Sequence, residues 1–173
     1  MPQGTESSNL SPSAMKKGFT LIELLMTIAI IGILASIVFA ALGHSTTDAR
    51  DARRKTEVAQ IGRLLTLSCY LPNAGAGDYD IADLVPELKT KYPQYEAQLS
   101  NLPHDPKIGS ASETHYRYVV SADSKCALYA NFESEAHAAT LTITAPTAGG
   151  GTGIFATPTS GPNGSHKYFQ TSN

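Results

Sequence analysis

Apolar residues are concentrated in one run near the start of the chain. The run from Phe19 to Leu42 is 24 residues long and holds a single charged residue, Glu23. As an α-helix it would measure about 36 Å, which exceeds the ~30 Å hydrocarbon core of a bilayer. Its apolar residues occupy every side of such a helix, whereas a helix packed on a soluble core has one apolar stripe. The pattern therefore predicts a membrane-spanning helix, with a buried core helix as the weaker alternative.

A charged stretch follows the apolar run, and its spacing still favours a helix. Seven of the ten residues over 48–57 are charged, and acids are interleaved with bases. Asp51 and Lys55 are four residues apart, as are Arg53 and Glu57, so each couple can form an ion pair one helical turn apart. We interpret this cluster as a solvated charged face, and a patch for nucleic acid or anionic lipid is the alternative.

Beyond the charged stretch, apolar residues recur with a helical period. Val58, Ile61, Leu65 and Cys69 fall on one face of a continued helix. We therefore predict one nearly continuous helix over residues 19–68. Its first half suits lipid or neighbouring helices, and its second half is amphipathic and packs its stripe on a globular head.

The remainder of the chain contains short alternating runs separated by turns. Residues 115–121 and 126–132 read as two strands of a hairpin. Residues 140–144 place threonine and aliphatic side chains on opposite faces and predict a third strand. Gly161-Pro-Asn-Gly164 is a good turn between two further strands, at 154–157 and 167–170.

Two other features complete the expected head. Residues 72–77 are turn-rich and predict a loop, and residues 80–83 resemble a capping box that opens a short helix ending near Lys91. Two prolines exclude regular helix from residues 102–106. The fold class expected is α+β: a long N-terminal helix packed on a small antiparallel β-sheet.

A polar segment precedes the apolar run, which reverses the order found in a secretory signal peptide. Residues 1–18 are rich in serine and end in Lys16-Lys17-Gly18. In a secretory signal the cleavage site follows the apolar stretch instead. The lysine pair should keep the N-terminal side in the cytoplasm by the positive-inside rule, so that residues from Gly43 onward lie outside.

The residues from Lys16 to Leu25 resemble the processing motif of type IV pilins and of the pseudopilins of type II secretion systems. The shared features are the basic pair, Gly18, an aromatic residue at Phe19, and Glu23 as the fifth residue after the glycine. The resemblance implies cleavage by prepilin peptidase between Gly18 and Phe19, followed by N-methylation of the new Phe19 amine. It also implies the same helix-on-sheet architecture.

The resulting division of the chain has three parts. Residues 1–18 form a cleaved hydrophilic leader, and residues 19–70 form the long helix with the transmembrane and assembly segment 19–42. Residues 71–173 form the globular β-sheet head.

Glu23 is the one carboxylate in the apolar run. Its insertion costs about 2.5–3.5 kcal/mol unless it is paired or reaches the interface. Cleavage would create a cation at Phe19, one helical turn away, and in a bundle of helices that amine could meet Glu23 of a neighbour. Such a pair would favour one axial offset between neighbouring helices, because any other offset leaves a buried charge unpaired. The alternative is a solvated Glu23 without a role.

The two cysteines of the chain stand at the ends of predicted elements. Cys69 closes the long helix and Cys126 opens a strand. Outside the cytoplasm a disulfide between them would staple helix to sheet, and two buried thiols are the alternative. Two cysteines exclude a disulfide scaffold and a four-cysteine zinc site.

Composition and motifs argue against catalysis and against nucleic-acid binding. The chain has 13 Lys and Arg against 15 Asp and Glu, and the head is acidic. Its five histidines lack metal-ligand spacing, and Gly149–Gly153 lacks the lysine of a phosphate loop. We expect no enzyme activity and no cofactor. The weaker alternative is a calcium site among the acids, for which we expect capping and turn roles: Asp78, Asp80, Asp83 and Asp123.

The function predicted is that of a filament subunit. The chain would sit in the cytoplasmic (inner) membrane as a single span with its N-terminus in the cytoplasm, and then enter a filament at the cell surface. Residues 19–42 would contact identical subunits and other pilins, prepilin peptidase/N-methyltransferase would process it, and an assembly ATPase and platform protein would act indirectly. The alternatives are a monomeric membrane-anchored binding protein and a pseudopilin for DNA uptake or secretion.

Overall fold

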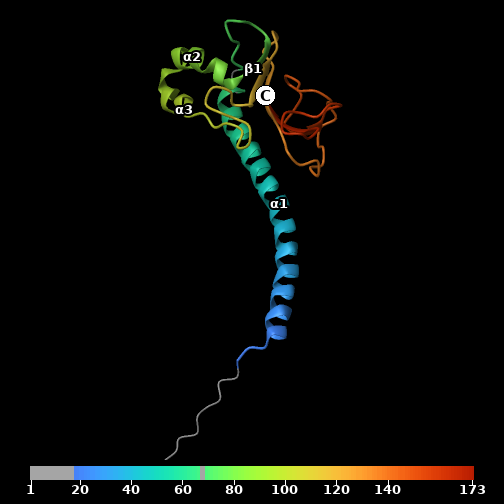
Figure 1. Ribbon diagram of the computed structural model, residues 1–173. Helices are drawn as coiled ribbons and strands as arrows, with labels where there is room; N and C mark the ends of the chain where they lie inside the picture. Colours follow the sequence, from blue (N-terminus) through green and yellow to red (C-terminus); the bar gives the residue numbers. More distant parts are fainter. Residues whose placement is uncertain (1–17, 67–68) are drawn as a thin grey trace, which may run out of the picture. The chain divides into compact units, whose positions relative to one another are not determined.

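The computed structural model describes residues 18–66 and 69–173, and it divides into one unit that ends at Ala41 and another from Leu42 to Asn173 (Figure 1). Helix α1 (Leu21–Leu65) is a single 45-residue α-helix. The predicted long helix is thus confirmed over these residues. Its expected last residue, Ser68, lies outside the described part, as does the basic pair Lys16 and Lys17.

The second unit adds three short helices and one antiparallel sheet to the C-terminal half of α1. The strands lie in the order β1-β2-β3-β5-β4, and every neighbouring pair is antiparallel. The elements are β1 (Gly77–Asp80), α2 (Ile81–Lys91), η1 (Pro93–Tyr95), α3 (Glu96–Ser100), β2 (Arg117–Val120), β3 (Cys126–Asn131), β4 (Gly153–Ala156) and β5 (Lys167–Ser172). The α+β fold class is confirmed.

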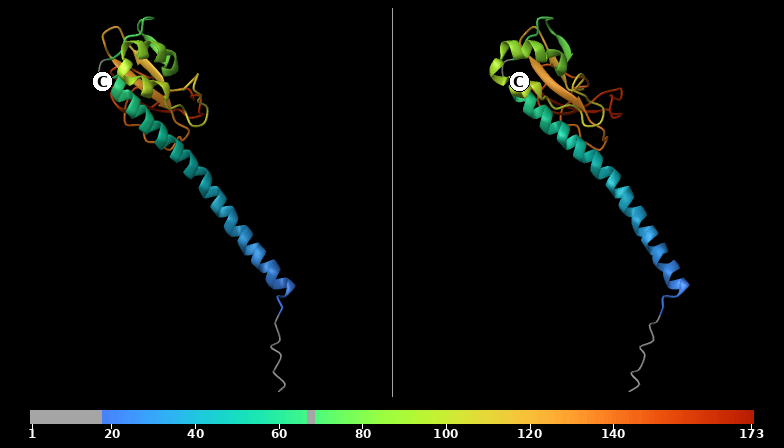
Figure 2. Two further views of the ribbon diagram at one scale, coloured as in Figure 1. Left: turned by 90° about the vertical axis from the view of Figure 1, so that its left-hand side faces the viewer. Right: turned by 60° about the vertical axis from the view of Figure 1, so that its left-hand side comes forward.

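The core lies between the last turns of α1 and one face of the sheet, and both views of Figure 2 show these turns alongside the strands. The predicted stripe Val58, Ile61 and Leu65 is buried there against side chains such as Leu128 and Phe169. Strand β3 contributes Cys126, Leu128 and Ala130 to this core, because every second residue of a strand points to the same face. Helices α2 and α3 close the same core with leucine and isoleucine side chains.

Gly62 permits the closest approach of α1 to the sheet. A Cβ atom at this buried position would lie 2.0 Å from Cγ2 of Thr171 on β5. No heavy atom fits at that distance, so any larger residue would have to displace the Thr171 side chain or push helix and strand apart.

Most elements of the head form where the local sequence pattern predicts them. Both predicted hairpins form, as β2–β3 and β4–β5. The predicted helix cap also forms, since Asp80 accepts from the Ala82 N–H at 2.9 Å. The same carboxylate accepts from the backbone N–H groups of Thr114 (3.1 Å) and His115 (2.8 Å), which ties α2 to the segment before β2.

The sequence pattern misses one strand and predicts another that does not form. It predicts a loop over residues 72–77 and a helix cap from residue 80, but residues 77–80 form β1 because β2 offers them a pairing edge, with Tyr79 opposite Tyr118. Residues 140–144 form no strand. Within this segment the backbone N–H groups of Thr140 and Leu141 bond the sheet, both at the Ile154 carbonyl (2.7 and 2.9 Å), and the backbone bends at Leu141 and Thr144 instead of continuing as a strand.

Candidate functional site

Helix α1 begins with a reciprocal capping box formed by Thr20 and Glu23. Glu23 Oε2 accepts from the Thr20 N–H at 2.9 Å and from Thr20 Oγ1 at 2.7 Å, and Thr20 Oγ1 accepts from the Glu23 N–H at 3.3 Å. This Thr-x-x-Glu spacing is a standard start signal for a helix, and the sequence reasoning missed it. Gly18 and Phe19 lie just before the helix, outside regular secondary structure, and Phe19 is 85% exposed.

The first part of α1 presents an apolar surface on all sides. Residues Leu21–Phe39 are long and apolar enough to cross a membrane, and none of this window is buried. The large side chains in it are exposed by between 46% (Ile30) and 80% (Leu21). An exposed apolar surface of this extent marks a segment that contacts lipid or another protein.

The charged stretch of α1 is solvated on one side, where Asp48, Arg53 and Lys55 are exposed, but Asp51 and Arg54 are buried in an ionic cluster, and for these two residues the expected solvated face was wrong. Arg54 is fully buried. Its guanidinium contacts Asp51 at 2.7 Å, Asp105 at 2.8 Å and Glu133 at 2.8 Å. Arg50 adds a bidentate pair with Glu133, at 2.7 Å for both bonds.

The cluster is balanced in charge. Three carboxylates face three cations, because Lys107 Nζ also lies 3.3 Å from Glu133. Every buried polar side-chain atom in the described residues has a hydrogen-bond partner. Such satisfaction is what allows charges to remain buried in a low dielectric.

The pairs within the helix differ in their outcome. Arg53 and Glu57 pair at 2.7 Å as predicted. The expected pair of Asp51 with Lys55 does not form, because Asp51 turns to Arg54 and the Lys55 ammonium lies over the Phe169 ring at 5.7 Å.

Three loops of the head supply the other members of the cluster. Asp105 comes from the proline-containing segment after α3, and Glu133 follows β3. Asn163 lies in the turn between β4 and β5 and donates from Nδ2 to Asp105 at 2.6 Å. Nδ2 also donates to the Asn131 carbonyl at 3.0 Å, so the buried Asn163 side chain ties the β4–β5 turn to the cluster.

The cluster lowers the pKa of two of its acids, Asp105 and Glu133. Burial opposes ionisation of Asp105, but hydrogen bonds from Arg54, the Lys107 N–H and Asn163 lower the pKa of its carboxyl to about 2. Hydrogen bonding from Arg50, against a smaller effect of burial, lowers the pKa of Glu133 to about 2. The cluster therefore joins α1 to three loops across the whole neutral pH range.

A disulfide adds a covalent connection to the ionic one between helix and sheet. Cys69 and Cys126 are bonded, with their Cα atoms 5.4 Å apart, and the predicted bridge is confirmed. It links the chain just after α1 to the first residue of β3. Both residues are buried, which shields the bond from solvent.

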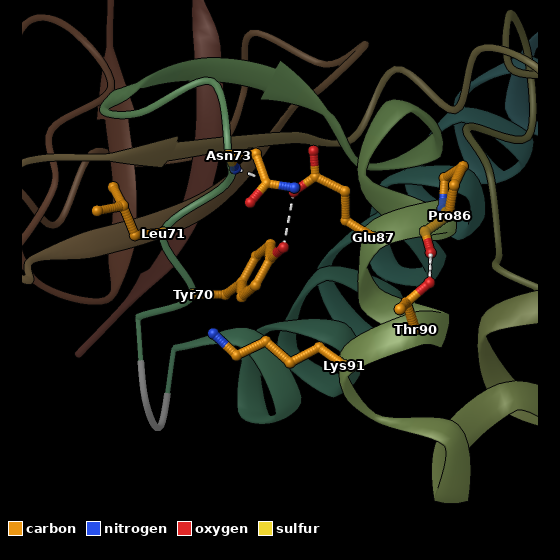
Figure 3. Close-up of a pocket in the computed structure, with 7 residues that line it drawn as sticks. All are labelled: Tyr70, Leu71, Asn73, Pro86, Glu87, Thr90 and Lys91. Atoms are coloured by element: carbon orange, nitrogen blue, oxygen red, sulfur yellow. Dashed lines mark hydrogen bonds between the residues drawn. The ribbon is translucent and has the colours of Figure 1, made fainter.

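A cavity of about 430 Å³ lies beside this junction, between the chain after Tyr70 and helix α2 (Figure 3). Its carboxylate, Glu87, accepts from the Tyr70 hydroxyl at 2.7 Å and the Asn73 N–H at 3.1 Å. The Lys91 ammonium lies 4.9 Å from the centre of the Tyr70 ring. These contacts hold residues 70–73, which follow Cys69, against helix α2.

Three of the four acids considered for calcium have protein partners, and Asp80 is one of them as the cap of α2. Asp78 pairs with Arg117 and accepts from Tyr129, while Asp123 contacts Ser121 and Lys125. Within residues 18–66 and 69–173 no three His, Cys, Asp or Glu side chains are grouped to hold a metal ion. The lack of a cofactor stays a prediction.

The comparison with known protein families found one match, to the prokaryotic N-terminal methylation motif, over residues 13–39. No curated protein and no solved structure matched the chain. The match covers the processing motif, the capping box and the exposed apolar part of α1. Residues 13–39 of this chain thus carry the signal motif of type IV pilins and pseudopilins.

Proposed function

We propose that the chain is a structural subunit of a type IV pilus or pseudopilus-like filament. One observation carries the proposal: the methylation motif coincides with a helix segment, Leu21–Phe39, that is apolar and that no described residue of the chain buries. Such a helix can leave lipid only for another apolar environment, which a bundle of identical helices provides. The role is structural, without catalytic groups or a cofactor.

Processing would create the group that completes the assembly site. Cleavage between Gly18 and Phe19 removes the leader, residues 1–18, and leaves a mature chain of 155 residues. The Phe19 amine is then methylated. Prepilin peptidase/N-methyltransferase would carry out both steps, after Lys16 and Lys17 have held the N-terminus in the cytoplasm.

The two oxygens of Glu23 can serve different partners. Oε2 accepts both hydrogen bonds from Thr20, while Oε1 has no hydrogen bond within the described residues. Oε1 can therefore accept from the Phe19 amine of a neighbouring subunit without loss of the helix cap. A pair of this kind in low dielectric favours one stagger of the helices over all others.

The head would follow the helix into the filament. The ionic cluster around Arg54 and the Cys69–Cys126 bridge connect the polar half of α1 to the sheet. Force applied to that half of the helix therefore reaches the sheet through buried and covalent links. Residues 71–173 would form the filament surface, and a separate ATPase and platform protein would supply the energy for extraction from the inner membrane.

Mass spectrometry of surface filaments tests this function. Filaments sheared from cells should contain a chain that begins with methylated Phe19. A chain found only as a monomer that keeps residues 1–18 would refute the proposal and favour the membrane-anchored binding protein. Filaments built from uncleaved chains would refute the processing step.

A further inference from the structure

A second cavity, of about 480 Å³, opens on the face of the sheet that is turned away from α1. Tyr129 of β3 and Tyr168 of β5 line it, whereas their neighbours Leu128 and Phe169 lie in the core against α1. Successive side chains of a strand point to opposite faces, which places the cavity on the outer face. Its volume falls within the range of about 300–1,000 Å³ that is typical of small-molecule sites.

Two loop segments of similar sequence complete the lining of this cavity. They are residues 144–146, Thr-Ala-Pro, and residues 157–159, Thr-Pro-Thr, which follow β4. The Thr157 N–H donates to the His166 carbonyl at 2.9 Å, and Thr157 Oγ1 donates to the Thr159 carbonyl at 2.6 Å. Hydrogen bonds within the turn therefore fix the position of Thr159.

The aromatic part of the lining is also held in place. The Tyr129 hydroxyl donates to Asp78 at 2.6 Å, and Asp78 pairs with Arg117 at 3.1 Å. Phe155, which does not line the cavity, packs nearly parallel to Tyr168 with the ring centres 5.4 Å apart. The two tyrosine rings are tilted by 56° with their centres 6.1 Å apart. A lining ordered before a ligand arrives lowers the entropic cost of binding.

Three hydroxyl groups on this lining can bond a ligand. In the part of the chain that the structure describes, the hydroxyls of Thr144, Thr159 and Tyr168 make no hydrogen bond. Both threonines are exposed, and Tyr168 is half-buried. Burial raises the pKa of Tyr168, so its hydroxyl keeps its proton at neutral pH. Each of the three groups can therefore both donate and accept.

The lining disfavours other classes of ligand. An ion would find no counter-charge, because no lining residue is charged and residues 136–165 contain no Asp, Glu, Lys or Arg. A wholly apolar ligand would strip water from the three hydroxyls without replacing its hydrogen bonds. A proline-rich peptide suits aromatic grooves, but its prolines have no N–H group to donate to these oxygens.

We propose that this cavity binds an uncharged saccharide. A sugar ring has an apolar C–H face, which suits the negative π-face of a tyrosine ring. It also has a rim of hydroxyls that both donate and accept, as the groups of Thr144, Thr159 and Tyr168 do. The inference goes beyond the proposed filament function, because it concerns a ligand of the head and requires no assembly.

Saturation-transfer NMR on the full chain tests the binding. The chain is held in micelles of a zwitterionic detergent, because a detergent with a sugar head group would compete. The probes are the methyl glycosides of glucose, galactose, mannose, N-acetylglucosamine and N-acetylgalactosamine, with an oligoproline peptide as the rival class. At least one glycoside should receive saturation, with a Kd of about 1 mM, because one aromatic contact and a few neutral hydrogen bonds supply no more.

Two variants locate the site. Thr159→Val removes an exposed hydroxyl at nearly constant volume and should weaken binding of that glycoside about fivefold, the effect of one neutral hydrogen bond. Tyr168→Phe removes the other hydroxyl and should have a similar effect. The matched control is Thr90→Val, at an exposed threonine beside the cavity on α2, and it should bind like the unmodified chain. Urea midpoints show that each variant is folded, and Thr159→Val decides if Tyr168→Phe is not.

Three outcomes would overturn the saccharide site. They are no saturation of any glycoside, unchanged binding by folded Thr159→Val, and an oligoproline that binds more tightly than every glycoside. The last result would assign the cavity to a proline-rich peptide instead. None of them bears on the filament function, because the chain is tested here as a monomer and the filaments are tested by their N-terminal residue.

Discussion

Replacement of Arg54 by methionine should destabilise the head strongly and change the sign of its response to acid. The substitution keeps an unbranched side chain that can fill the inner part of the site but removes the guanidinium cation from a fully buried position. Asp51 and Asp105 then lose their main counter-ion, while Arg50 and Lys107 remain near Glu133. Removal of one partner from a buried ion pair costs about 3–5 kcal/mol. That is a large part of the ~5–15 kcal/mol by which folded domains are stable.

The pH dependence follows from the carboxyl groups. In the unmodified chain the folded-state pKa of Asp105 is about 2, below its usual value near 3.9. This group therefore stabilises the fold above about pH 4, and that contribution is lost as pH falls toward 2. In Arg54→Met, burial without the cation raises the pKa of Asp105. The variant should therefore gain stability as pH falls from 7 toward 5, opposite to the unmodified chain.

Urea unfolding of the full chain in detergent micelles, followed by near-UV circular dichroism, measures both effects. The matched control is Arg53→Met, which removes an exposed pair one residue away and should cost at most about 0.5 kcal/mol. A further variant, Arg54→Met with Asp105→Leu, should recover much of the loss, because no unpaired carboxylate then remains at that site. Equal losses for Arg54→Met and Arg53→Met, or no change in the response to pH, would refute a buried, charge-balanced cluster.

Three further predictions concern other parts of the chain. Glu23→Ala should leave cleavage and membrane insertion intact but abolish filaments. Glu23→Gln can still cap the helix, so it should also abolish filaments if the charge of Glu23 is what assembly requires. The measurement for both variants is the amount of filament in the fraction sheared from cells. Gly62→Ala should lower the free energy of unfolding by about 1–3 kcal/mol through overpacking against Thr171, and Thr171→Ser should relieve it; an unchanged urea midpoint would contradict the close contact. Serine at both Cys69 and Cys126 should cost about 2–4 kcal/mol, and a smaller loss by the same assay would show that the bridge adds little.

The sequence alone determined the features that depend on neighbouring residues. The apolar run, the basic pair with Gly18, and the spacing to Glu23 identified the membrane-competent helix and the processing motif. The stripe from Val58 to Leu65 and the two hairpins followed from periodicity and turn residues. With two cysteines, each at the end of an element, only one disulfide was available, although its formation depended on the fold.

Only the tertiary structure decided how residues far apart in the chain would pair. Arg54 reads as one charge in a solvated run, but Asp105 is 51 residues away and Asn163 is 109 residues away, and their approach turns a surface into a buried cluster. Strand β1 exists because β2 offers an edge, whereas residues 140–144 contact β4 only through Thr140 and Leu141 before the backbone bends. Local preference sets what a segment can become, whereas pairing, burial and charge compensation depend on partners that the linear pattern does not bring together.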